Sequence, residues 1–378
     1  MQRARKVARQ PRGGRGTTLV GLDIEPGLIV AAKSHLNGGL VVDHAAFLPI
    51  DIEIVRDGEV QDVPALVTAL AELFKGSGLD RRVRIGIANQ RILMRRIELP
   101  PLTDPSEIAQ AVQFQARDEI PMPLETVVVD YHTLGIVERE GGPRLQVLLV
   151  AARRDMVERV LHAARLAGLQ PEGVDLAAFG MVRALHPVDA AEHERILYLA
   201  IGGLTNIAIA DGLTCEFTRV IPFGVEQIAS DVASRCAIPV DAARQILITM
   251  PIASPVPDQP RIPELESAPT TELATSHDDA VSGADNVAVA REALDDGIRR
   301  IGSEVRNSLD FYLAAQDASA VARAVLTGPA LEIPGFDRAL SRQLGIAVER
   351  GVVASGVIDV PASILPVAAG LSVVEGVQ

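Results

Sequence analysis

Two glycine-rich turns, far apart in the chain, contain the residues whose types and spacing are suited to chemistry. Residues 21–30 form an apolar strand pattern, a Gly/Pro turn and a second strand pattern, and residues 197–209 repeat that plan around Gly202 and Gly203. Glycine lets backbone N–H groups approach phosphate oxygens closely. A pair of such hairpins, each opening a mixed α/β half, is typical of a two-lobed fold that binds phosphate between its lobes.

A phosphate clamp that also performs hydrolysis needs carboxylates to position Mg²⁺ and water. Asp23 is retained in the first turn, whereas Ala200 stands where the second turn would carry a carboxylate. Asp23 has two interpretations, a magnesium ligand or an ordinary turn carboxylate. The second turn also has two, since Gly202 and Gly203 suit either a phosphate contact or a structural turn. The missing carboxylate predicts impaired or absent hydrolysis.

The composition is that of an acidic protein with a large core. Of its 378 residues 48% are hydrophobic, which excludes a disordered chain and allows two or three domains. Aromatic residues make up 3% and Trp is absent, which argues against a surface that stacks sugars or single-stranded nucleic acids. The net charge of −13 disfavours nucleic-acid binding in general.

Residues 1–16 depart from this acidic character. They contain no acidic residue and several basic ones, namely Arg3, Arg5, Lys6, Arg9, Arg12 and Arg15. The segment is interpreted either as a disordered tail or as a contact for acidic lipid headgroups or an acidic partner.

Cysteine usage and hydropathy indicate where the protein works. Cys215 and Cys236 are too few for a disulfide framework, so we expect a reducing compartment. No run of about eighteen apolar residues and no signal-peptide pattern is found. The histidines show no metal-ligand spacing. We therefore expect a cytoplasmic protein without direct membrane insertion, which reaches a membrane only through a partner.

The first half of the chain alternates between predicted strands and helices. We expect an amphipathic helix over residues 64–75, and strands over residues 18–33, 38–51, 82–87 and 92–99. Asp104 is a predicted helix cap, with Pro105 at the first position. That helix has one apolar stripe, formed by Ile108, Ala111, Val112 and Ala116, with Phe114 off its centre.

The second half contains a segment of different composition. Residues 251–286 are rich in Pro, Ser, Thr and acidic residues, and we expect a disordered loop there. A long helix is predicted from about residue 286 to 315, followed by a last α/β stretch over 325–374. Before this loop, a hairpin over 126–151 leads to a helix from about 155 to 168.

Several blocks of the sequence, in their shared order, resemble the PilM family of type IV pilus assembly proteins. The most distinctive block pairs "RIELP" at residues 96–100 with a helix that ends in "IPMPL" at residues 120–124. The other similar blocks are residues 110–116, 130–131, 147–152, 167–169, 174–175, 219–224, 304–312, 326–330 and 333–336.

The resemblance implies an α/β, two-lobed actin-like ATPase (ribonuclease H-like) fold with a small inserted subdomain, related to the division protein FtsA. It implies a first lobe over residues 17–90, an inserted subdomain over 91–165 and a return to the first lobe over 166–193. The second lobe would then comprise residues 194–235, a subdomain over 236–304 and residues 305–360, with a final return to the first lobe over 361–378.

The resemblance also implies a function in binding. Family members bind the short tail of PilN, an inner-membrane protein, in a groove between the first lobe and the small subdomain. Other pilus platform proteins and self-association are further implied contacts, and the protein would be peripheral at the inner face of the cell membrane. The groove candidates in this sequence are Arg96, Phe114, Glu119 and Leu124.

The nucleotide-binding pattern of the family is altered in this sequence. Glu25 replaces a Gly, Pro26 removes an N–H donor, and Val30 stands at the position of a Lys. We expect weak or absent ATP binding, with Mg²⁺ at Asp23 if it binds, and therefore a pseudo-ATPase adaptor. The candidate nucleotide residues are Asp23, Gly27, Gly202, Gly203, Thr205, Asn206, Glu304, Ser308, Thr327, Gly328 and Pro329.

Three alternatives remain open at this point. The protein could be an active ATPase, in which Glu25 or Asp23 takes over from the lost carboxylate. It could form FtsA-like filaments, although the residues up to Gln378 lack a basic amphipathic helix. A platform protein of type II secretion shares the fold, whereas the "RIELP" block favours the pilus family.

Overall fold

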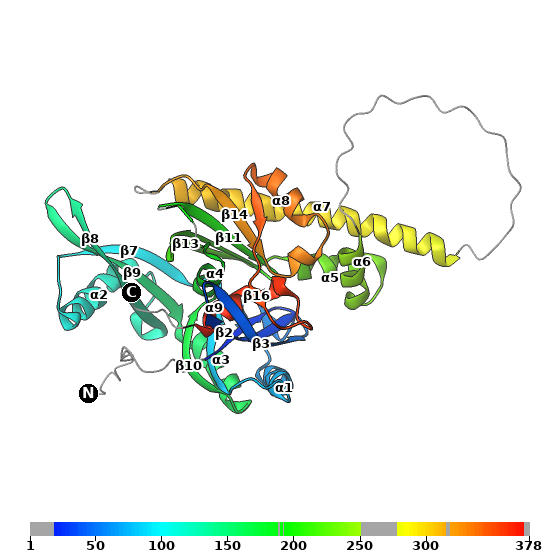
Figure 1. Ribbon diagram of the computed structural model, residues 1–378, viewed down its shortest axis with the longest axis horizontal. Helices are drawn as coiled ribbons and strands as arrows, with labels where there is room; N and C mark the ends of the chain where they lie inside the picture. The colour runs from blue at the N-terminus through cyan, green and yellow to red at the C-terminus, as the bar shows by residue number, and fades with distance from the viewer. Residues whose placement is uncertain (1–18, 188–189, 192, 251–277, 315–317, 374–378) are drawn as a thin grey trace, which may run out of the picture.

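A six-stranded sheet and a five-stranded sheet form the frame of the molecule (Figure 1). The computed structural model describes residues 19–187, 190–191, 193–250, 278–314 and 318–373. The strand order of the six-stranded sheet is β10-β6-β1-β2-β3-β16. Its strands are β1 (Val20–Glu25), β2 (Leu28–Leu36), β3 (Leu40–Pro49), β6 (Arg82–Ile87), β10 (Gln170–Leu176) and β16 (Ala354–Ser355).

The five-stranded sheet repeats the local topology of the six-stranded sheet. Its order is β13-β12-β11-β14-β15. In the first sheet β1 pairs antiparallel with β2 and parallel with β6, and in the second β11 pairs antiparallel with β12 and parallel with β14. The predicted repeat of two hairpins is thus confirmed. The strands are β11 (Arg195–Ile201), β12 (Thr205–Asp211), β13 (Thr214–Ile221), β14 (Arg323–Thr327) and β15 (Val348–Arg350).

Two helices lie between the sheets, and the other large helices cover their outer faces. Met181 of α4 (Ala177–Leu185) and Leu371 of α9 (Pro366–Ser372) share one core with Val30 of β2 and Tyr198 of β11. All seven residues of α9 are buried, because it is enclosed on both sides. The outer helices are α1 (Val63–Phe74) and α3 (Arg154–Leu166) on the six-stranded sheet, and α5 (Val225–Cys236), α7 (Asp278–Leu313) and α8 (Phe336–Leu344) on the five-stranded sheet.

A small three-stranded sheet projects to one side of this frame (Figure 1). Its order is β7-β9-β8, and helix α2 (Pro105–Glu119) packs on one face. As predicted, Asp104 caps α2 by accepting hydrogen bonds from the backbone N–H groups of Ser106 and Glu107. The strands are β7 (Leu93–Leu99), β8 (Val127–Arg139) and β9 (Gly142–Arg153).

The shorter elements connect these units. Helix α6 (Val240–Thr249) packs against α5 and α7. The remaining pieces are the strands β4 (Val55–Arg56) and β5 (Glu59–Val60) and the 3₁₀ turns η1 (Leu124–Thr126), η2 (Pro329–Glu332) and η3 (Ala362–Ile364). Across the described part of the chain, no helix is both long and apolar enough to cross a membrane.

Two predicted boundaries are wrong. Helix α7 begins at Asp278, so the predicted loop does not extend to residue 286. Acidic residues are well tolerated in the first turns of a helix. The acidic composition of this stretch therefore did not exclude a helix, although it suggested a loop. Strand β16 pairs with β3, whereas residues 305–360 were expected in the second lobe. The basic segment 1–16 and the rest of the predicted loop lie outside the described residues, and the lobe boundaries otherwise stay predictions.

Candidate functional site

The two glycine-rich turns contact each other directly at the centre of the molecule. The first turn joins β1 to β2, and the second joins β11 to β12. The backbone N–H of Gly203 donates a hydrogen bond to Glu25 Oε2 at 3.1 Å. A Cβ atom on Gly203 would lie 1.9 Å from the carbonyl oxygen of Pro26. Only glycine at this position permits the observed approach of the two turns.

The Glu25 carboxylate lies over the second turn, where a bound phosphate would need backbone donors. A Cβ atom on Gly202 would lie 2.3 Å from Glu25 Oε1, and Leu204 N–H also hydrogen-bonds the Glu25 carboxylate. A carboxylate and a phosphate compete for the same N–H groups. In this conformation the residues of the two turns therefore do not fit a phosphate group.

The charges around the turns are predominantly negative. Burial raises the pKa of Asp23 from 3.8 to about 7. Burial, followed by the charges of Asp23 and Glu226, raises the pKa of Glu25 well above its ordinary value, although the Gly203 N–H opposes this shift. Glu226 is paired with Arg244, at 2.6 Å from Nη2 to Oε2. A polyphosphate placed here would add negative charge beside these carboxyl groups and would favour their protonated forms further.

The structure does not bring together a set of metal ligands at Asp23. In the described ranges, no group of three or more His, Cys, Asp or Glu side chains is arranged to hold a metal ion. The magnesium interpretation of Asp23 therefore gains no additional ligands from the described chain.

Several of the predicted nucleotide residues line a narrow cavity beside the turns. It is lined by Asp23, Gly202, Thr327, Gly328 and Pro329, among others, and by Ala200 where the carboxylate is missing. The cavity has room for about one or two water molecules. The cavity brings some of the residues predicted for phosphate together with some of those predicted for adenosine, but a nucleotide does not fit into this conformation.

Two predicted hydroxyl donors already have partners in the protein. Thr205 Oγ1 donates to the carbonyl oxygen of Phe223 at 2.8 Å, and Thr327 Oγ1 donates to that of Ser363 at 2.8 Å. Both threonines are completely buried. Their hydroxyl groups hold neighbouring loops in place.

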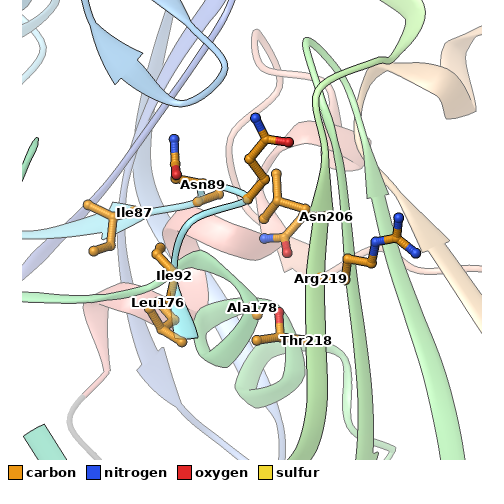
Figure 2. A pocket seen from close by; sticks show the side chains of 11 residues that line it. Ile87, Asn89, Ile92, Leu176, Ala178, Asn206, Thr218 and Arg219 are labelled. Carbon is orange, nitrogen blue, oxygen red and sulfur yellow. The ribbon is translucent and has the colours of Figure 1, made fainter. Parts of the chain in front are cut away.

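The remaining nucleotide candidates lie elsewhere. Glu304 and Ser308 of α7 hydrogen-bond to Arg219 of β13, each at 3.2 Å, and do not line the cavity of Asp23. Gly27 faces Glu226, whose Cγ would lie 2.9 Å from a Cβ on that glycine. Asn206 lines a second pocket between the lobes (Figure 2). The residues predicted to bind one nucleotide therefore lie at several separate places in the structure.

The groove candidates lie on the small sheet and its helix. Phe114 of α2 is 68% exposed, whereas Leu124 packs against the core of the small sheet. Glu119 is partly buried at the end of α2. Arg96 of β7 forms an ion pair with Glu216 of β13, at 3.0 Å from Nη2 to Oε1.

Glu216 is a residue that the sequence analysis missed. It is a nearly buried carboxylate that also accepts a hydrogen bond from the Tyr312 hydroxyl at 2.6 Å. Burial, followed by this hydrogen bond and the charge of Glu216, raises the pKa of Tyr312 to about 12. The only signal in the sequence is a single acidic residue in the strand pattern after Cys215.

The paired turns, the two sheets and the helices between them define a protein of the two-lobed actin-like ATPase class, with a small inserted subdomain. A sequence profile described as type IV pilus assembly protein PilM matches residues 21–253. The chain belongs to this family.

Solved structures share this fold over nearly the whole chain. A PilM–PilN type IV pilus biogenesis complex matches with a TM-score of 0.70 and 22% identity, over 94% of this chain and 98% of that one. The ethanolamine utilization protein EutJ from Carboxydothermus hydrogenoformans matches with a TM-score of 0.51 and 15% identity, over 95% and 90%. MreB 5 of Spiroplasma citri bound to AMPPNP matches with a TM-score of 0.50 and 11% identity, over 94% and 95%.

Proposed function

We propose that the protein is a cytoplasmic adaptor of type IV pilus assembly, or of the related type II secretion platform, with a degenerate nucleotide cleft. It binds the N-terminal tail of a PilN-like inner-membrane protein and is held at the inner face of the cell membrane by that partner. Family membership and the likeness to a PilM–PilN complex support the binding half of this proposal.

One contact carries the proposal of a degenerate cleft. The hydrogen bond from Gly203 N–H to Glu25 fills the second turn with a carboxyl group that belongs to the protein. ATP could bind at this place only after Glu25 had moved away and the Pro26 carbonyl had separated from Gly203. Interactions made within the protein thus replace those that a bound nucleotide would make between the lobes.

The exposure of Phe114 supports a partner site on the small sheet. Phe114 is a large aromatic side chain that is 68% exposed on an otherwise polar helix face. Covering such a side chain with a partner lowers the free energy of the complex. The Arg96–Glu216 ion pair joins the same small sheet to the second lobe. Binding near Arg96 would therefore change a contact of the second lobe.

Calorimetric titration with a synthetic PilN-like tail tests the binding half. We expect Phe114→Ala to weaken the affinity about tenfold, since aromatic anchors dominate such interfaces. Phe311→Ala is the matched control, because Phe311 is also 68% exposed but lies at the end of α7. Equal effects of the two variants, or no binding by the unmodified protein, would contradict the proposed site.

Titration with ATP and Mg²⁺ tests the cleft separately. We expect the unmodified protein to show no turnover and little or no binding. The double variant Glu25→Gly with Ala200→Asp restores the residue types of the family pattern and is expected to gain nucleotide affinity. Robust turnover by the unmodified protein would overturn the degenerate cleft and leave the adaptor proposal intact.

A further inference from the structure

The parallel strands β1, β6 and β10 begin at the same edge of the six-stranded sheet. Val20 of β1 lies opposite Val83 of β6. Gln170 of β10 lies opposite Arg82 of β6. Helices α1 and α3 lead into β6 and β10 respectively, so the C-terminal ends of both helices reach this edge as well. Figure 1 shows α1, α3 and β10 together on the side of the molecule away from α7 and α8.

Three exposed basic side chains lie at this edge of the sheet. They are Lys75 after α1, Arg81 before β6 and Arg165 in the last turn of α3. Arg81 connects the two helix ends. Its Nη1 donates to the Ala167 carbonyl oxygen at 3.4 Å, and its guanidinium lies 5.9 Å from the centre of the Phe74 ring. None of the three basic side chains forms an ion pair with a carboxylate in the part of the chain that the structure describes.

Two of the acidic side chains nearby already have a basic partner. Asp80 pairs with Lys33 at 2.9 Å. Glu172 pairs with Arg82 at 2.8 Å. Glu72 is a further exposed carboxylate, one turn before the end of α1. The described residues at this edge therefore carry an excess of positive charge, although the net charge of the whole chain is −13.

The basic segment 1–16 joins the described chain at the same edge. Only Thr17 and Thr18 lie between the segment and Leu19, and β1 begins at Val20. The segment contributes six basic residues and no acidic one. Because so short a connection separates them, the segment and the helix ends can act on one and the same anionic surface.

An exposed leucine lies among these charges. Leu166 is 59% exposed at the end of α3, directly after Arg165. An anionic bilayer suits this combination, because its phosphate groups attract the basic side chains while an apolar side chain enters the boundary of the acyl region. Its headgroups are also free to rearrange around basic residues that come from separate elements, whereas a folded acidic protein presents carboxylates at fixed positions.

We infer that Lys75, Arg81, Arg165 and Leu166 form a docking face for an anionic lipid surface, together with the basic segment 1–16. The paired turns lie at the opposite end of β1, after Glu25. The docking face shares no residue with the candidate partner and nucleotide sites, and the inference does not rest on the proposed adaptor function. It favours the lipid interpretation of the basic segment.

Co-sedimentation of the full chain with lipid vesicles tests the inference. Vesicles of phosphatidylcholine alone are compared with vesicles in which about a third of the lipid is phosphatidylglycerol. We expect binding to the anionic vesicles only, with an affinity that falls steeply as salt is added. Equal binding to both kinds of vesicle, or binding to neither, overturns the inference. Binding to polyglutamate without binding to anionic vesicles would assign the face to an acidic protein and also overturn it.

Charge variants test whether the described face takes part. Each basic residue at an anionic surface strengthens binding about fivefold, so we expect the triple variant Lys75→Gln, Arg81→Gln and Arg165→Gln to bind at least about tenfold more weakly. The control changes the net charge equally at exposed arginines of α7 and α8, namely Arg291→Gln, Arg338→Gln and Arg342→Gln, and should bind like the unmodified protein. Equal weakening of both variants would show that only net charge matters. Full binding by the first variant would show that the basic segment acts alone, and either result contradicts the docking face.

A leucine pair tests the apolar part without changing any charge. We expect Leu166→Ser to weaken binding to anionic vesicles about fivefold, since binding grows with the apolar area that enters the interface. Leu213→Ser is the matched control, because Leu213 is 58% exposed in the turn between β12 and β13. Equal binding by the two variants would show that Leu166 does not enter the bilayer and would contradict the docking face.

Discussion

The two glycine-rich turns occupy equivalent positions in their sheets but have opposite chemical roles. The β11–β12 turn keeps Gly202 and Gly203 and offers backbone N–H donors. The β1–β2 turn has no backbone N–H donor at Pro26 and carries the carboxyl group of Glu25. One copy has thus become the ligand of the other. The difference teaches that two equivalent turns can bind each other when one offers backbone N–H donors and the other carries a carboxyl group.

The hydrogen bond between the turns also joins the two lobes through residues of the chain itself. Phosphate bound between two turns joins two lobes only while the nucleotide is present. Glu25 makes the same kind of bond from within the chain, between residues 178 positions apart. This contact holds three carboxyl groups, those of Asp23, Glu25 and Glu226, close together.

The contact between the turns is broken most directly at Gly203. We expect Gly203→Ala to destabilise the protein by about 3 kcal/mol or more, because its Cβ would lie 1.9 Å from the Pro26 carbonyl oxygen and the backbone must shift. Denaturant unfolding measures the effect. Gly39→Ala is the control, since a Cβ there meets no atom within 4 Å, and it should change little. Similar stability of both variants would show that the turns do not touch.

The carboxylates of the first turn predict a pH-dependent stability. Because the folded pKa of Asp23 is about 7, above its ordinary 3.8, the native state binds more protons than the unfolded state between these values. The contribution of Asp23 to stability is therefore full below pH 3.8 and is lost as the pH rises through about 7. Asp23→Asn removes this titration.

We expect Asp23→Asn to match the unmodified protein near pH 4 and to exceed its unfolding free energy by about 4 kcal/mol near pH 8. Thermal unfolding over this range measures the difference. Asp118→Asn, at an exposed position of α2, should show no such divergence. A parallel pH dependence in both variants would argue against a raised pKa at Asp23.

A smaller effect is expected where the small sheet meets the second lobe. Arg96→Ala removes the ion pair with Glu216, which keeps its hydrogen bond from Tyr312, so we expect a loss of about 1 kcal/mol. Arg95→Ala, one residue away on an exposed side chain, is the matched control. If Arg96→Ala costs as much as Gly203→Ala, this ion pair contributes as much to the contact between the lobes as the paired turns do.

Local elements were predictable because short-range interactions determine them. The strand over residues 82–87, the Asp104 cap and the buried stripe of α2 follow from side-chain periodicity and hydrogen bonds within a few residues. The start of α7 was missed because its Ser, Gly and Asp content is also typical of linkers. The family followed from the order of its motifs rather than from any single residue.

The sequence by itself determined the duplicated hairpin, the loss of a carboxylate at Ala200 and the altered residues Glu25 and Pro26. Only the tertiary structure decided that Glu25 bonds to Gly203 and that Arg96 is engaged by Glu216. The physical reason is that these features depend on how two separately folded sheets meet, and no periodicity within either segment encodes the distance between atoms on different lobes.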